Sequence, residues 1–153
     1  MKLLTETNTR LTGTAILLLR CMVGIVFFVA GAGKVFGWFG GMGLQATLDI
    51  FKTQTNISAA WTYIHCYVEL IGGLLLIVGL LTRPAAFLLV INMLVAIIIM
   101  GTKNFFMGGA AYPFSLMVSS LVILLTGPMA YSIDAWLLNK KRIPSQPVRT
   151  SFV

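Results

Sequence analysis

Four side chains that can carry charge or exchange protons fall inside apolar stretches of this 153-residue chain: Arg20, Lys34, His65 and Glu69. Ionisable groups at membrane depth are costly, so they usually face a bundle interior and pair with one another. At 1.5 Å per residue, Arg20 lies about 13 Å and Glu69 about 18 Å from the inner ends of their predicted helices. We therefore predict an Arg20–Glu69 ion pair, which either fixes helix packing or orients Glu69 for chemistry.

His65 and Lys34 are the next candidates. His65 precedes Glu69 by one helical turn and could share its proton, as a relay or as a hydrogen-bond partner of a ligand carbonyl. The alternative is a histidine satisfied at the membrane interface beside Trp61 and Tyr63. Lys34 either extends to the outer boundary or, because it lies on the same helical stripe as Arg20, faces a ligand.

Other chemistry is not indicated by the sequence. Cys21 and Cys66 are isolated in apolar runs and are interpreted as small buried hydrophobic residues. The chain contains one histidine, which argues against a b-type haem held by this chain alone. There is no phosphate-binding glycine loop, nucleophile elbow or H-E-x-x-H sequence. We expect no metal site and no cofactor of the chain's own.

Helical spacing gathers the polar residues into stripes. Small residues beside the charges would let membrane helices approach closely. The four stripes are predicted to converge on one polar interior. They comprise, from the first to the fourth predicted helix, Arg20, Gly24, Phe27, Gly31 and Lys34; His65, Glu69, Gly72, Gly73 and Leu76; Asn92 and Ala96; and Ser115, Ser119 and Thr126.

The composition indicates that these helices lie in a membrane. The chain is 58% hydrophobic and 10% charged, whereas a soluble domain is about a quarter charged, so a soluble globular protein is excluded. A bilayer core needs about 20 apolar residues per helix. We predict an all-α, integral membrane four-helix bundle with helices at about 11–36, 59–81, 85–100 and 114–129, the last able to extend to 137. The bundle forms one domain, residues 1–138, followed by a polar basic tail, residues 139–153.

The basic residues predict the orientation. The formal charge of +7 is assigned to membrane topology rather than to nucleic acid binding, because Lys and Arg collect at cytoplasmic ends. Both termini and the joint at 82–84 are therefore predicted to be cytoplasmic, with the loops at 37–58 and 101–113 outside. In the first loop, Leu44, Leu48 and Phe51 share one face of a short helix expected to lie on the outer surface. We expect a multi-pass protein of the inner (cytoplasmic) membrane.

Three segments make the chain similar to a known family. LLRCMVGIVFFVAGAGKVFG, VELIGGLLLIVGLLTRPAA and GPMAYSIDAWL resemble the DoxX family of small four-helix bacterial membrane proteins, and the similarity spans residues 18–137. One departure is Ala111, where the family often has an acidic residue near the start of the fourth helix. The residues that the resemblance carries over are Arg20, Gly31, Lys34, Glu69, Gly72, Gly73, Thr82, Arg83, Ser132 and Asp134.

The resemblance implies a redox-linked role, since some relatives look like the quinone-reactive membrane subunit of thiosulfate:quinone oxidoreductase. We expect a membrane subunit of a redox assembly that binds a quinone or similar small molecule. Glu69 and His65 would exchange protons with it, and a partner subunit would carry the electrons. The alternatives are a structural or accessory subunit bracing a larger membrane complex and, less favoured, a small-solute or lipid carrier. The expected binding residues are Arg20, Lys34, His65, Glu69 and Asn92.

Overall fold

The computed structural model describes residues 9–55, 57–100, 109–128 and 132–134. These residues contain helices and no strand, which confirms the predicted all-α class. The elements are α1 (Thr9–Phe36), the short 3-10 helix η2 (Trp38–Gly40), α2 (Gly43–Thr55), α3 (Ala59–Val78), α4 (Thr82–Met100) and α5 (Ala111–Thr126).

Three of these helices are long and apolar enough to cross a membrane: Leu11–Phe36, Ala59–Val78 and Thr82–Ile99. The fourth predicted span, α5, is apolar but has 16 residues. Its end at Thr126 precedes Gly127, whose φ of 71° breaks the helix before the predicted boundary at 129. The proposed extension to 137 and the tail at 139–153 run into residues outside those described.

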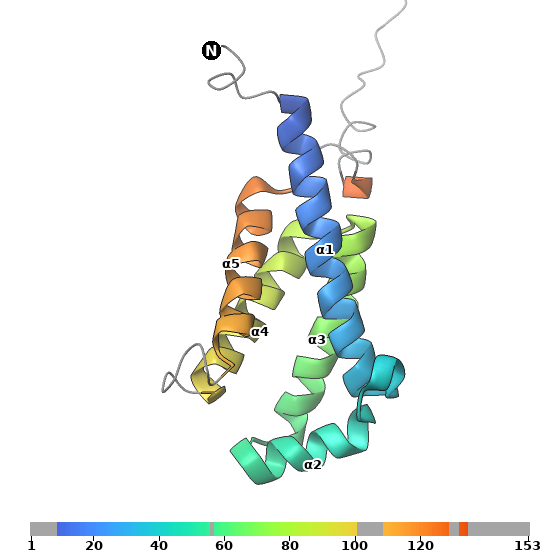
Figure 1. The fold of residues 1–153 in the computed structure, drawn as a ribbon, viewed down its shortest axis with the longest axis vertical. Coiled ribbons are helices and arrows are strands. Elements are labelled where there is room, and N and C mark those ends of the chain that lie inside the picture. Colours follow the sequence, from blue (N-terminus) through green and yellow to red (C-terminus); the bar gives the residue numbers. More distant parts are fainter. Residues whose placement is uncertain (1–8, 56, 101–108, 129–131, 135–153) are drawn as a thin grey trace, which may run out of the picture.

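The helices alternate in direction, and α2 lies across one end of the bundle (Figure 1). We call this the α2 end and the opposite one the junction end, because residues 79–81 connect α3 to α4 there. Helix α1 packs chiefly on α3, and α4 packs chiefly on α5. Toward its start, α1 projects beyond the α3–α4 junction (Figure 1). The assignment of the junction end to the cytoplasm stays a sequence-based prediction.

Glycines fix the register of α1 against α3. A Cβ added to Gly31 would lie 2.5 Å from the backbone nitrogen of Leu70, and one added to Gly73 would lie 2.4 Å from that of Phe28. Only glycine permits backbones to approach this closely, as is usual where membrane helices pack. The α1–α3 contact therefore has one register, in which Gly31 lies level with Leu70, Phe28 with Gly73 and Gly24 with Ile77.

The bundle core is apolar and small, and much of the outer surface is apolar too. Large side chains such as Leu18, Ile71 and Leu125 are 66%, 53% and 71% exposed, as expected where the surrounding solvent is lipid. The fully or largely buried core contains Val23, Phe27, Leu76, Ala85, Ala86, Leu89, Met93, Leu116 and Ile123.

The predicted surface helix in the first loop is confirmed as α2. Gln45, Asp49 and Lys52 are exposed, while Leu48 and Phe51 on the other face are partly buried against the bundle. Amphipathic spacing thus places one face of α2 over the ends of the long helices.

Asp134 caps the start of α4 from a distant part of the chain. Its carboxylate accepts hydrogen bonds from the backbone nitrogens of Leu81 and Thr82, at 2.9 and 2.8 Å, and from Thr82 Oγ1 at 2.9 Å. A negative charge at a helix N-terminus is favourable. Burial alone would raise the pKa of Asp134, but these hydrogen bonds and the charge of Arg20 together lower it.

Replacing Asp134 with Asn should lower the free energy of unfolding by about 1 kcal/mol, the usual size of a capping interaction. Because the folded-state pKa is lowered, the carboxylate's contribution is complete above its ordinary value of 3.8 and is lost as the pH falls through the folded-state pKa. Thermal unfolding in nanodiscs measured against pH checks this. Identical acid dependence in the variant and the wild type would contradict it.

Candidate functional site

Four polar side chains from three helices meet near the α2 end. Lys34 Nζ of α1 donates to Glu69 Oε2 of α3 at 2.5 Å and lies 3.2 Å from His65 Nε2. His65 Nδ1 lies 2.8 Å from Asn92 Oδ1 of α4, and its Nε2 lies 3.4 Å from Glu69 Oε1. The Glu69 side chain is 4% exposed and that of Lys34 is 29% exposed. The structure therefore links α1, α3 and α4 through one buried network, which we call the polar cluster.

The contacts of His65 define its protonation. An ammonium group has no lone pair and can only donate hydrogen bonds, so Lys34 donates to the lone pair of His65 Nε2. The proton of the imidazole then lies on Nδ1, which donates to Asn92 Oδ1. This assignment follows from the hydrogen-bond network and describes a neutral ring. His65 is thus bridged between a cation and an amide.

Lys34 and Glu69 meet because side chains tilt toward the N-terminus of their own helix. Helices α1 and α3 are antiparallel (Figure 1). The Lys34 side chain on α1 therefore reaches toward the bundle centre while that of Glu69 on α3 reaches toward the α2 end. In the register that Gly31 and Gly73 impose, the two side chains converge.

The predicted Arg20–Glu69 ion pair is not the arrangement that the structure shows. The guanidinium of Arg20 lies at the junction end, where a Cβ added to Gly79 would be 2.9 Å from its Nη1. Gly79 follows Glu69 by ten residues, about 15 Å along a helix. The prediction assumed that the inner ends of the two helices, at residues 11 and 81, lie at the same depth. In the structure α1 begins well beyond the α3–α4 junction (Figure 1). Arg20 and Glu69 also tilt in opposite directions.

A cavity of about 530 Å³ opens beside the polar cluster, and we call it the chamber. Its polar lining is supplied by Lys34, His65, Glu69 and the ring of Tyr112, and all five α-helices contribute to its wall. Neither Arg20 nor Asn92 lines it. The apolar remainder of the lining is Phe27, Ala30, Ile50, Phe51, Met93, Ala96, Ile99, Pro113 and Leu116.

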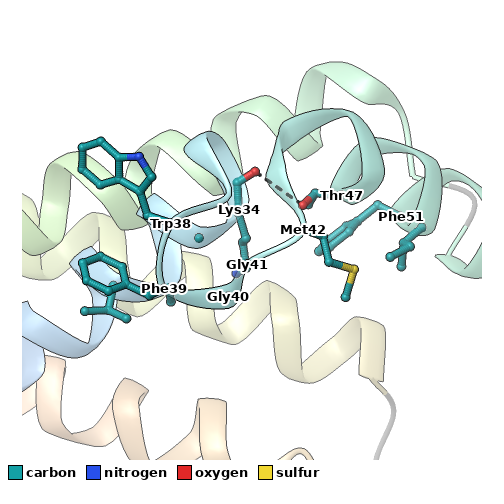
Figure 2. A pocket seen from close by; sticks show the side chains of 12 residues that line it. Lys34, Trp38, Phe39, Gly40, Gly41, Met42, Thr47 and Phe51 are labelled. Atoms are coloured by element: carbon teal, nitrogen blue, oxygen red, sulfur yellow. Dashed lines mark hydrogen bonds between the residues drawn. The ribbon is translucent and has the colours of Figure 1, made fainter.

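Helix α2 contributes to the wall of the chamber at the α2 end through Ile50 and Phe51. The ring of Phe51 lies over His65, with ring centroids 5.5 Å apart. A smaller cavity of about 390 Å³ lies at the corner between α1 and α2, and it shares Ala30, Lys34, Ile50 and Phe51 with the chamber. Figure 2 shows this corner, where Thr47 Oγ1 approaches the carbonyl oxygen of Lys34 at 3.5 Å. The two cavities therefore adjoin at these four residues.

Phe51 and Tyr112 are among the chamber residues that were not predicted as site residues. Phe51 carries an amphipathic signal that places it on the inner face of α2, but no chemistry marks it. Tyr112 also lines the chamber. It follows Ala111, the first residue of α5, so a phenol lies next to the position where the family often has an acid.

The arrangement can bind and polarise an acceptor. A partly buried ammonium next to an apolar cavity strengthens hydrogen bonds to a carbonyl oxygen because the local dielectric is low. A carboxylate at 2.5 Å from that ammonium can take or return a proton. In the described part of the chain no group of three or more His, Cys, Asp or Glu side chains is gathered as metal ligands would be.

Comparisons with known proteins agree with the fold. The sequence model of the DoxX family matches residues 15–102. The chain is 32% identical over 126 residues to the Bacillus subtilis protein named "Putative oxidoreductase CatD", covering 82% of this chain and 89% of that protein. It is 31% identical over 137 residues to the Escherichia coli "Inner membrane protein YqjF", covering 86% and 98%. No solved structure matches. With three helices able to cross a bilayer, the chain is a multi-pass inner membrane protein that belongs to the DoxX family.

Proposed function

We propose that the chamber binds a quinone, or a small molecule with the same planar dicarbonyl chemistry, as the membrane-embedded part of a redox-linked assembly. The observation that carries the proposal is the Lys34–Glu69 ion pair with His65 at the wall of an apolar cavity. Ligand sites are mostly apolar cavities with a few placed polar groups and volumes of about 300–1,000 Å³. The chamber, at about 530 Å³, falls in this range.

The polar cluster has the groups that quinone reduction needs. The reaction adds two electrons and two protons to a quinone and gives a quinol. Lys34 would donate a hydrogen bond to one carbonyl oxygen and stabilise the negative charge that develops there. The ammonium group of Lys34 would give one proton to the reduced oxygen that it contacts, and Lys34 would regain a proton from solvent through Glu69. Tyr112 would give the second proton to the opposite oxygen and would regain one from solvent. His65 would hold Lys34 in position through Nε2.

The electrons would come from a partner subunit. The proposal names that partner by its chemistry, as a chain with a bound redox group that docks on this membrane domain. The Bacillus subtilis relative carries the word oxidoreductase in its name, which supports a redox role for this scaffold.

The experiment is equilibrium binding of a water-soluble benzoquinone to the purified protein in lipid nanodiscs. Replacing Lys34 with Met should weaken binding by about 10- to 100-fold, because a hydrogen bond to a charged group contributes about 1.5–3 kcal/mol. Lys52→Met, which removes an exposed lysine of α2, should change nothing.

Two results would contradict the proposal. One is the absence of benzoquinone binding by the wild-type protein, and the other is equal binding by the wild type and Lys34→Met. Either result would favour the accessory-subunit alternative, in which the Lys34–Glu69 pair serves only to tie α1 to α3.

A further inference from the structure

A second cavity lies outside the chamber, between α3 and α4. This groove has a volume of about 460 Å³. Along most of its length it is lined by aliphatic side chains, including Ile64 and Val68 of α3 and Leu88, Ile91 and Val95 of α4. Ile64, Leu88 and Ile91 are 52%, 50% and 42% exposed. Since both helices are long and apolar enough to span the membrane, the groove is accessible from the hydrocarbon of the bilayer.

The groove and the chamber meet at one place. Phe51, His65 and Ile99 line both cavities. The hydrogen bond from His65 Nδ1 to Asn92 Oδ1, 2.8 Å long, crosses from α3 to α4 there. The two cavities therefore adjoin at Phe51, His65 and Ile99.

Asn92 is one of the polar residues that line the groove, together with Thr62 and His65. It lines the groove, is 8% exposed, and its Oδ1 accepts from His65. Its Nδ2 is buried and has no hydrogen-bond partner in the described structure. A buried amide N–H without an acceptor is costly, so its presence points to an acceptor that the protein alone does not provide.

We infer that the groove holds the apolar chain of the ligand, with Asn92 Nδ2 donating to an oxygen next to the point where that chain is attached. This inference rests on the proposed function, because the head group of the same molecule occupies the chamber. It narrows the ligand to a lipid-dissolved molecule with a hydrocarbon or prenyl chain. Such a molecule enters sideways from the bilayer between α3 and α4.

The test compares two probes on one variant. The probes are a benzoquinone that carries a decyl chain and the same benzoquinone with a methyl group in its place. Ile91→Trp fills the groove and should weaken binding of the decyl probe about tenfold while changing the methyl probe less than about twofold. Partition of each probe into the lipid cancels from the ratio of the two affinities, because the wild type and the variant are measured in the same nanodiscs.

A matched control is Leu94→Trp, which adds the same ring on the same helix at a position that is 46% exposed and lies outside the groove. It should leave both probes unchanged. Val95→Phe, a second groove variant, should repeat the Ile91→Trp result if Ile91→Trp folds poorly.

The failures of the two proposals are distinguishable. If the groove variants weaken neither probe, or weaken both probes equally, the groove does not hold the chain and the inference is overturned while the chamber proposal stands. If the wild type binds neither probe, the proposed function fails and the inference fails with it.

Discussion

Lys34→Met is expected to lower the free energy of unfolding by about 3 kcal/mol, because it leaves the Glu69 carboxylate buried without its cation. The Glu69 side chain is 4% exposed, whereas that of Lys34 is 29% exposed. Because only one partner is fully buried, we expect a loss at the lower end of the range of stability losses for broken buried ion pairs. Reversible unfolding in mixed micelles measures it.

The double variant Lys34→Met with Glu69→Gln separates this effect from lost packing. Removing the charge of Glu69 as well should restore more than half of the lost stability, because no uncompensated charge then remains. If the double variant is no more stable than Lys34→Met alone, the ion pair is not the source of the loss.

Gly73→Ala is the second large effect, and it acts through helix packing. The new methyl group would lie 2.4 Å from the backbone nitrogen of Phe28 and 2.8 Å from the carbonyl oxygen of Gly24. Backbone atoms cannot turn away, so α1 and α3 must separate. We expect a loss of about 3 kcal/mol in unfolding free energy, the upper range for overpacking, and loss of benzoquinone binding because Lys34 moves away from His65.

Gly72→Ala is the matched control one residue earlier. There the new methyl group meets only the side chain of Leu89, at 3.0 to 3.2 Å, and a leucine can adjust its rotamer. The loss should be under about 1 kcal/mol, with binding retained. Equal losses in the two variants would show that the α1–α3 backbone contact does not set the register.

The sequence was sufficient for the fold class, because apolar stretches and helical stripes predicted the bundle. Polar residues at membrane depth marked Lys34, His65, Glu69 and Asn92, but Arg20 and the stripe of the last helix were predicted to share the same interior. Arg20 lies at the junction end instead, and the hydroxyls of Ser115, Ser119 and Thr126 donate to carbonyl oxygens of their own helix. Such residues are easily recognised because few polar side chains occur within membrane-spanning helices, and those that do usually face the bundle interior.

The pairing within the cluster could not be predicted in the same way. It depends on the register of α1 against α3, which Gly24, Gly31 and Gly73 set through backbone contacts and which the lengths of apolar stretches do not reveal. For the same reason Arg20 was placed level with Glu69, although its guanidinium lies against Gly79.

Long-range contacts account for the remaining omissions. Phe51 joins the chamber only because α2 folds back across the ends of the long helices (Figure 1). The cap of α4 comes from Asp134, more than fifty residues away along the chain. The amphipathic spacing of α2 places Phe51 on the inner face but does not show which residues it meets, and no local pattern shows that Asp134 caps α4.

The carbonyl stretching frequency of isotope-labelled benzoquinone bound to the protein tests the central claim most directly, because it reports whether Lys34 donates to the ligand. Infrared difference spectra in nanodiscs should show a carbonyl band at lower frequency than in lipid alone, since hydrogen bonding weakens the C=O bond. The shift should be absent in Lys34→Met and present in Lys52→Met. A band at the lipid frequency in the wild type would contradict a ligand site at the polar cluster.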